Sequence, residues 1–124
     1  MKQLIITLLL LVATFSSAYS SNPIQLQTNT VYVDYGDGNG YSHVAKSVIT
    51  ITTDFDNDLI TIGNIERFDV QFVDNFTFDK YKLLRCNCYD SNGIECIVEY
   101  FIYPNAIYFK VSYDYFVYKY KILQ

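Results

Sequence analysis

Residues 82–102 read KLLRCNCYDSNGIECIVEYFI, and this stretch decides the fold. Its even positions are mostly apolar, and its odd positions include Arg85, Asn87, Glu95 and Glu99, as in a strand with one buried face. Ser91, Asn92 and Gly93 divide the stretch in two. A three-residue loop with glycine in the left-handed conformation is a common hairpin closure. The pattern therefore predicts two antiparallel strands joined by a tight turn.

The length of this loop sets the register of the hairpin. A three-residue loop predicts four cross-strand pairs, Leu83 with Phe101, Arg85 with Glu99, Cys86 with Val98 and Cys88 with Cys96. A two-residue turn at Asn92 and Gly93 would shift the register by one residue and mix the two faces of the sheet. We therefore expect the three-residue loop.

Two further hairpins follow along the chain. Pro104 and Asn105 suit the centre of a type I turn, which places Glu99 opposite Lys110 and Phe101 opposite Tyr108. A turn at residues 113–114 predicts three more pairs, Ile107 with Tyr120, Phe109 with Tyr118 and Val111 with Phe116. Each cross-strand pair of opposite charges or aromatic rings contributes about 0.2–1 kcal/mol. The agreement of three turns predicts a ladder of four strands.

The first half of the chain supplies the remaining strands. β-Branched and alternating runs occur at residues 31–35, 48–52, 59–62 and 68–72, and such runs form poor helices and good strands. Turn residues separate the runs, and the connections are short. The sequence thus predicts an all-β fold, an antiparallel meander of about eight strands that forms an up-and-down barrel or a two-sheet sandwich.

The N-terminus has the layout of a secretory signal peptide. Lys2 is followed by an apolar run at residues 4–12 and by small residues that end at Ala18. The run is shorter than the roughly 20 residues that span a bilayer. We expect cleavage after Ala18, or alternatively after Ser20, and residues 19–124 as a single all-β domain. The mature protein is then secreted or periplasmic and is not inserted in a membrane.

The composition is acidic and rich in tyrosine. The formal net charge of −4 argues against nucleic acid and anionic lipid as partners. The chain has 13 tyrosines, 9 phenylalanines and no tryptophan. Leu83, Phe101 and Tyr108 form an expected outer row across three strands, and aromatic side chains are favoured in binding surfaces. The alternative explanation of the tyrosine content is an AT-rich genome.

Three cysteines in an exported chain indicate one disulfide and one remaining thiol. The expected register places Cys88 opposite Cys96, which makes them the preferred pair. A diagonal bridge between Cys86 and Cys96 is the alternative. Whether Cys86 is free or bridged is left open, and a redox or metal role for these residues is not expected because no histidine or fourth cysteine lies nearby.

The sequence contains no recognisable reaction centre and predicts no cofactor. The single histidine, His43, lies in a polar stretch, and a lone exposed histidine is rarely catalytic. Asp54, Asp56 and Asp58 are weak candidates for a hard cation, but the spacing of a calcium loop is missing, so no metal site is predicted. Asn75 begins a glycosylation sequon that has meaning only in a eukaryotic source.

Three functions follow as hypotheses. The first is an exported, non-catalytic binding or interaction protein with a filled interior, which holds an unknown protein on its outer aromatic row or on the acidic loops near Asp37 and Asp56. The alternative is a lipocalin-like carrier of a small apolar ligand, in which the inward residues Tyr100, Tyr118 and Tyr120 line a barrel cavity. A small secreted hydrolase with His43 in a cleft ranks last.

Overall fold

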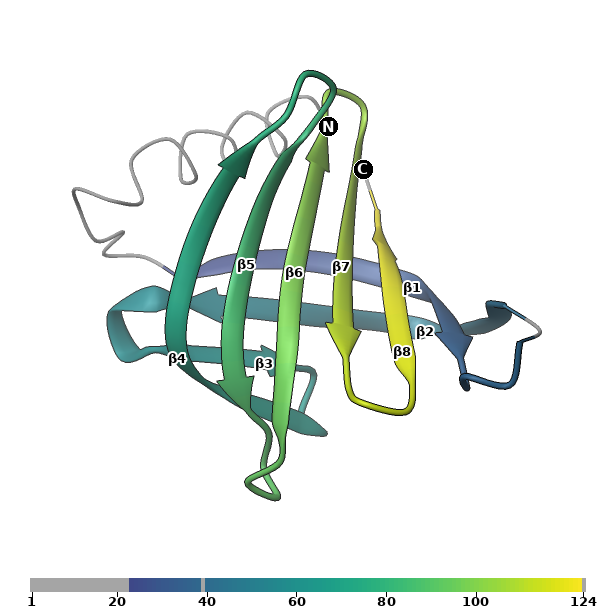
Figure 1. Ribbon diagram of the computed structural model, residues 1–124, viewed down its shortest axis with the longest axis horizontal. Coiled ribbons are helices and arrows are strands. Elements are labelled where there is room, and N and C mark those ends of the chain that lie inside the picture. The colour runs from purple at the N-terminus through teal and green to yellow at the C-terminus, as the bar shows by residue number, and fades with distance from the viewer. Residues whose placement is uncertain (1–22, 39, 124) are drawn as a thin grey trace.

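A computed structural model describes residues 23–38 and 40–123, which form a closed barrel of eight strands (Figure 1). The expected signal peptide, residues 1–18, lies outside the described residues. The strands are β1 (Ile24–Asp34), β2 (Ser42–Asp54), β3 (Leu59–Ile62), β4 (Glu66–Thr77), β5 (Lys82–Tyr89), β6 (Glu95–Tyr103), β7 (Ala106–Ser112) and β8 (Val117–Ile122).

The order of the strands in the barrel is their order in the chain. Each strand pairs antiparallel with the next, and β1 pairs with β8 to close the barrel. The prediction of an all-β antiparallel meander is confirmed. Of the two predicted alternatives, the closed sheet is the up-and-down barrel and not the two-sheet sandwich. The only helical segment among the described residues is the 3-10 turn Phe55–Asn57. The described residues contain no helix of the length and apolarity that crossing a membrane requires.

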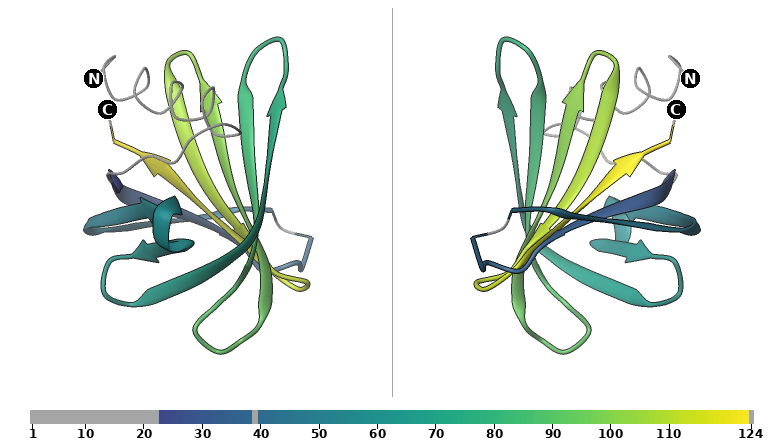
Figure 2. Two further views of the ribbon diagram at one scale, coloured as in Figure 1. Left: turned by 90° about the vertical axis from the view of Figure 1, so that its left-hand side faces the viewer. Right: turned by 90° about the vertical axis from the view of Figure 1, so that its right-hand side faces the viewer.

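The barrel is flattened into two crossing layers. Figures 1 and 2 show that β1, β2 and β3 run across the direction of β4 to β8. β4 belongs to both layers, because residues from Glu66 to Asp69 pair with β3 and residues from Asp69 to Thr77 pair with β5. A bulge lies between Val70 and Phe72. Bulges bend and twist a strand, which lets one strand turn the corner between layers.

A second irregularity lies where the barrel closes. The register of β1 shifts between Thr28 and Thr30 against both of its neighbours. The fully buried Thr28 hydroxyl donates to the Lys121 carbonyl oxygen at 2.7 Å and accepts from the Thr30 N–H at 3.3 Å. This side chain thus bonds to backbone groups at the point where the register shifts.

The interior is filled by inward-facing side chains. Rings form its centre, with Tyr100 packed edge-on against Phe109 at a centroid distance of 5.1 Å and Phe109 against Tyr120 at 6.1 Å. The largest fully buried side chains are Tyr100, Phe68, Phe109, Leu26, Ile51, Ile60, Leu84, Ile102, Ile107, Val98 and Val111. They come from both layers and belong to one cluster.

The predicted registers of the first two hairpins are confirmed. β5 and β6 pair Arg85 with Glu99 and Leu83 with Phe101, and β6 and β7 pair Glu99 with Lys110. Glu99 Oε2 lies 3.0 Å from Arg85 Nε and its Oε1 lies 3.7 Å from Lys110 Nζ. The carboxylate is buried at 5% exposure, so the two cations provide the compensation that a buried charge requires.

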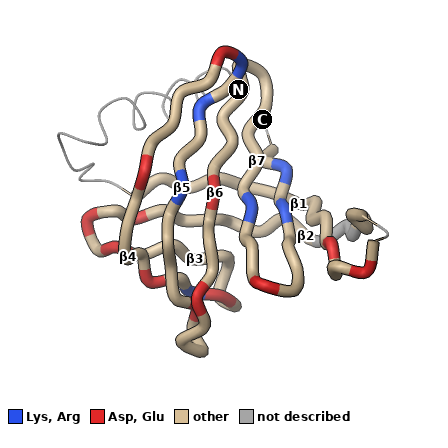
Figure 3. The backbone as a smooth tube through the Cα atoms, in the orientation of Figure 1, with Lys and Arg blue, Asp and Glu red and all other residues tan. Residues whose placement is uncertain are grey.

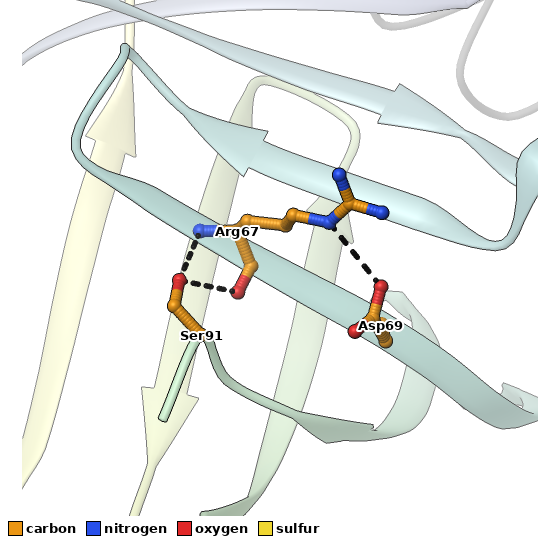
Figure 4. Close-up of polar contacts among 3 residues, drawn as sticks. All are labelled: Arg67, Asp69 and Ser91. Carbon is orange, nitrogen blue, oxygen red and sulfur yellow. Dashed lines mark hydrogen bonds and ion pairs between the residues drawn. The ribbon is translucent and has the colours of Figure 1, made fainter. Parts of the chain in front are cut away.

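The tip of the first hairpin is tied to the strand beneath it. The Ser91 hydroxyl accepts from the Arg67 N–H at 3.3 Å and donates to the Arg67 carbonyl oxygen at 3.4 Å, while Arg67 Nε lies 3.4 Å from Asp69 Oδ1 (Figure 4). The loop between β5 and β6 is thereby joined to the start of β4. Neighbouring hairpins are thus linked by side chains as well as by the ladder.

The predicted register of the last hairpin is wrong by two residues. Phe109 pairs with Tyr120 and Val111 with Tyr118, and the turn is centred on residues 114–115 in place of 113–114. Tyr113 donates its N–H to the Phe116 carbonyl oxygen at 2.9 Å, and the two rings stack at 4.7 Å. A slip of two residues keeps every side chain on its own face, so the apolar pattern does not distinguish the two registers.

The expected disulfide is absent. Cys88 and Cys96 are directly opposite, as predicted, yet Cys86, Cys88 and Cys96 are all buried free thiols. The Asp90 N–H donates to the Ile94 carbonyl oxygen, so alternation along the ladder makes the pair of Cys88 and Cys96 a hydrogen-bonded one. Cβ atoms are about 5.5 Å apart in such pairs, whereas a disulfide needs about 3.5–4.5 Å.

The environment of these thiols keeps them protonated. Burial raises the pKa of Cys88 to about 12 and that of Cys96 to about 11, and it raises the pKa of Cys86 well above its ordinary value. The Cys88 thiol points along its own strand to the Cys86 carbonyl oxygen, 3.7 Å away. Because the thiolate is the reactive form, these cysteines behave as small core side chains.

Candidate binding site

A pocket of about 470 Å³ lies on the outer face of the barrel over β6, β7 and β8, and we call it the outer pocket. It is lined by Tyr41, Phe101, Tyr103, Asn105, Ala106, Tyr108, Lys110 and Lys119. Pockets that hold small molecules measure roughly 300–1,000 Å³ and combine aromatic walls with a few polar groups. The outer pocket has this size and this composition.

The strand alternation builds the outer pocket. Odd positions of β6, even positions of β7 and odd positions of β8 point outward, so Phe101, Tyr108 and Lys119 reach the same face from three adjacent strands. The tight turn between β6 and β7 adds Asn105 to one rim. Tyr41, which precedes β2, reaches the pocket from the other layer of the barrel.

The aromatic walls are part of a larger network of rings. Tyr103 meets Tyr108 edge-on at a centroid distance of 6.2 Å. Tyr81 stacks on Tyr103 at 5.0 Å and lies 6.0 Å from Phe101. Beyond it, Phe78 stacks on Tyr81 at 4.8 Å. The pocket walls are therefore packed by neighbouring rings.

Two lysines stand among these rings. Lys110 Nζ lies 5.4 Å from the centroid of Phe101 and 3.7 Å from Glu99 Oε1. Lys119 Nζ lies 4.7 Å from the ring centroid of Tyr41, 5.2 Å from that of Tyr108 and 5.8 Å from that of Tyr32. Within residues 23–38 and 40–123, Lys119 forms no ion pair. Ring faces attract cations, but they do not neutralise them.

The electrostatics of the outer pocket follow from this arrangement. Burial lowers the pKa of Lys119, and the nearby positive charge of Lys110 lowers it further. Burial raises the pKa of Tyr41, as do the carboxylates of Asp34 and Glu99. The ammonium of Lys119 is thus partly desolvated beside a second cation, which is a favourable position for an incoming anion.

Two of the three expected binding residues line the outer pocket. Phe101 and Tyr108 are paired across β6 and β7 and are half-buried. Leu83 belongs to the same row, but it is only 5% exposed between Phe76 of β4 and Phe101. Sequence reasoning missed Tyr41 and Lys119. Tyr41 lies outside the three predicted hairpins, and the register predicted for the third hairpin, which contains Lys119, was wrong by two residues.

The three inward tyrosines lie in the core. Tyr100 is fully buried and its hydroxyl is hydrogen-bonded to the Thr53 hydroxyl across the interior. Tyr118 donates to Glu66 Oε2 at 2.6 Å, and its ring meets Tyr120 edge-on at 5.7 Å. All three side chains belong to the buried core cluster of the barrel.

The carboxylates proposed for a hard cation have local roles. Asp54 caps the 3-10 turn by accepting from the Asn57 N–H at 3.3 Å and from its side-chain amide at 2.8 Å, and Asp58 follows in the left-handed conformation. In the described part of the chain, no group of three or more His, Cys, Asp and Glu side chains is arranged to hold a metal ion.

The single histidine lies on the surface. His43 is exposed within β2, and its ring lies 5.3 Å from that of Tyr32. Asn75, the sequon residue, is exposed near the end of β4. Neither residue lines the outer pocket.

Two other hollows differ in character from the outer pocket. One of about 570 Å³ lies near the turn between β7 and β8 and includes Phe72, Tyr89 and Tyr113, and one of about 630 Å³ lies over β1 to β3 and is rich in threonine. Neither is lined by a lysine or an arginine. The outer pocket therefore combines rings and cations in a way that these two do not.

No protein-family model, no curated protein and no solved structure matches this chain.

Proposed function

We propose that this chain is an exported, non-catalytic binding protein that holds a saccharide in the outer pocket. One observation carries the proposal: tyrosine rings and polar groups form a concave wall on three strands that are paired on both sides. A tyrosine side chain offers a flat apolar face and a hydroxyl at its edge. A sugar ring likewise has an apolar C–H face and a rim of hydroxyls, so the two surfaces are complementary.

The alternatives fit the outer pocket less well. An extended peptide binds by adding a strand to a free sheet edge, but β6, β7 and β8 are each paired on both sides. A carrier of an apolar ligand needs an interior cavity, and inward rings such as Tyr100 and Phe109 occupy the interior. A purely apolar ligand would also leave the Lys110 and Lys119 ammonium groups desolvated and without a partner.

The lining of the outer pocket supports binding without catalysis. Its side chains include no carboxylate, histidine or cysteine, which are the usual acids, bases and nucleophiles of hydrolases. Export rests on the predicted signal peptide at residues 1–18, and a secreted or periplasmic protein meets saccharides on surfaces and in the surrounding medium.

The proposal is tested on an array of neutral and acidic oligosaccharides probed with the purified protein. We expect capture of a subset, and we expect Tyr108→Ala to reduce it at least about tenfold because a stacking wall of the pocket is lost. Tyr89→Ala is the matched control, since Tyr89 is an outward tyrosine of the same sheet that does not line the outer pocket. Absence of capture, or equal loss in both variants, would overturn the proposal.

A further inference from the structure

We propose that the outer pocket selects saccharides that carry an acidic group, a carboxylate or a sulfate, and that Lys119 together with Lys110 binds that group. This inference rests on the proposed function and names the class of sugar. It comes from a break in the charge pattern on the outer face of the sheet, from the absence of an acid beside Lys119, and from the position of both lysines inside the pocket.

A single row of cross-strand pairs runs over the outer face. The pairs are Asp74 with Arg85, Arg85 with Glu99, Glu99 with Lys110, and Lys110 with Lys119. The sign of the charge alternates along the row until Lys119, where a second cation stands in the place of an acid. Directly opposed like charges destabilise a sheet, so the protein carries an electrostatic cost at this pair.

The neighbouring carboxylate does not neutralise this pair. Glu99 is shared by Arg85, 3.0 Å away, and Lys110, 3.7 Å away, so one negative charge faces two positive charges before Lys119 is counted. Figure 3 shows basic positions on β5, β7 and β8 beside the acidic position of β6. Asp34, which raises the pKa of Tyr41, is the other carboxylate near this rim. The pocket floor thus keeps an excess of positive charge.

The rings around Lys119 strengthen its attraction for an anion. The rings of Tyr32, Tyr41 and Tyr108 lie 5.8, 4.7 and 5.2 Å from the ammonium and partly bury it. Its pKa is lowered by this burial and by Lys110, in the direction expected for a cation without a counter-charge. An anion bound in the pocket would supply the negative charge that no side chain of the described residues places beside Lys119.

The charge of the whole molecule limits how many acidic groups the ligand carries. The chain has a formal net charge of −4, with 13 acidic residues against 9 basic ones. Long polyanions such as nucleic acids are repelled by such a protein. Sugar units with isolated acidic groups meet only the local positive charge of the pocket, so a short acidic oligosaccharide is the ligand class that fits.

The test compares ligands that differ only in charge. Trigalacturonate and its methyl ester share the sugar rings, and only the first is an anion. We expect isothermal titration to give about ten- to a hundredfold tighter binding of the acid than of the ester, as for a hydrogen bond to a charged group. A sulfated galactan fragment distinguishes sulfate from carboxylate, and glutarate tests whether an acid without a sugar ring suffices.

Three variants assign the effect to Lys119. Lys119→Gln should bring the ratio of acid affinity to ester affinity close to one, because the charge that distinguishes the two ligands is gone. Lys119→Glu places an acid opposite Lys110 and so continues the alternation of charge along the row. The fold should therefore be retained, which thermal unfolding checks. Binding of the acid should be lost. Lys121→Gln removes the same charge from the same strand outside the pocket and should keep the preference.

The failures of the two proposals are distinguishable. Equal binding of acid and ester, or a preference that survives Lys119→Gln, would overturn the acidic class and leave saccharide binding in place. Binding of glutarate as tight as that of trigalacturonate would reduce the pocket to an anion site and overturn the sugar component. If no saccharide binds, both proposals fall.

Discussion

Asp90 shows how much a single side chain contributes to this barrel. Its Oδ1 accepts from the N–H groups of Asn92 and Ile94, both at 2.9 Å, and its Oδ2 accepts from the Tyr113 hydroxyl at 2.8 Å. The first two bonds close the loop between β5 and β6, and the third ties that loop to the one between β7 and β8. Aspartate is favoured in turns because its short side chain reaches backbone N–H groups nearby.

We expect Asp90→Ala to lower the free energy of unfolding by about 1–2 kcal/mol at neutral pH, because three hydrogen bonds are lost at an exposed loop. Burial acts to raise the pKa of Asp90, but the bonds from Ile94, Tyr113 and Asn92 outweigh it and hold the pKa below 3.8. The unfolded chain therefore binds this proton at higher pH than the folded chain does.

The contribution of Asp90 is accordingly complete above about pH 4 and is lost as the pH falls further. Urea unfolding of the wild type and of Asp90→Ala should converge in stability at acidic pH. Asp114→Ala, which changes an exposed acid in the other loop, should stay within about 0.5 kcal/mol of the wild type. A difference that persists unchanged to pH 2 would contradict this assignment.

At the scale of the element, the last hairpin shows that the apolar pattern predicts the faces of a strand but not its register. Alternation places Phe109, Val111, Tyr118 and Tyr120 on the inner face in both registers, so it predicts the faces and leaves the pairing undetermined. The stacking of Tyr113 on Phe116 and the bond between their backbones accompany the observed register. This register also places Lys110 opposite Lys119, and the proposed selectivity for acidic saccharides rests on that pair.

An engineered cross-link tests this register. The hydrogen bond from Tyr113 to Phe116 makes Ser112 and Val117 a non-hydrogen-bonded pair, with Cα atoms about 4.5 Å apart. Ser112→Cys with Val117→Cys should therefore oxidise to a disulfide and stabilise the protein by about 2 kcal/mol before strain. Peptide mapping under non-reducing conditions detects the bond.

The matched control places the second cysteine where the alternative register would have it. Ser112→Cys with Tyr115→Cys should remain reduced under the same conditions, because residue 115 lies within the turn. Formation of that bridge in place of the first would mean that the hairpin has the register expected from a turn at residues 113–114.

At the scale of the whole molecule, one polar pair crosses the filled interior. The hydroxyls of Thr53 on β2 and Tyr100 on β6 are hydrogen-bonded, and the two residues are 3% and 0% exposed. The bond connects the two layers of the barrel between strands that are not neighbours in the sheet. Buried hydroxyls cost free energy unless they are paired, so each depends on the other.

We expect Tyr100→Phe to lower the free energy of unfolding by about 1–3 kcal/mol, because the Thr53 hydroxyl is left buried without a partner. Thr53→Val should act similarly through Tyr100. The double variant should recover most of the loss, since neither polar group then remains. Denaturant unfolding of all four proteins measures the coupling, and a double variant whose cost equals the sum of the two single costs would exclude it.

The sequence by itself determined the local features of this protein. Period-two alternation and turn residues predicted the strands, the two faces of the sheet and the registers of two hairpins, since these depend on residues that lie close together in the chain. Arg85, Glu99 and Lys110 met as their spacing required. Phe101 and Tyr108 were also identified on the outer face, because that face follows from alternation alone.

The tertiary structure decided everything that depends on distant residues. Closure between β1 and β8 made the fold a barrel, and the hydrogen-bonded type of the pair of Cys88 and Cys96 kept their side chains too far apart for a bridge. The outer pocket depends on two such features. Tyr41 reaches β8 from the other layer, and the observed register of the last hairpin, which differs by two residues from the expected one, sets Lys119 opposite Lys110. Alternation has a period of two, so it carries no information about shifts of two residues or about contacts across the barrel.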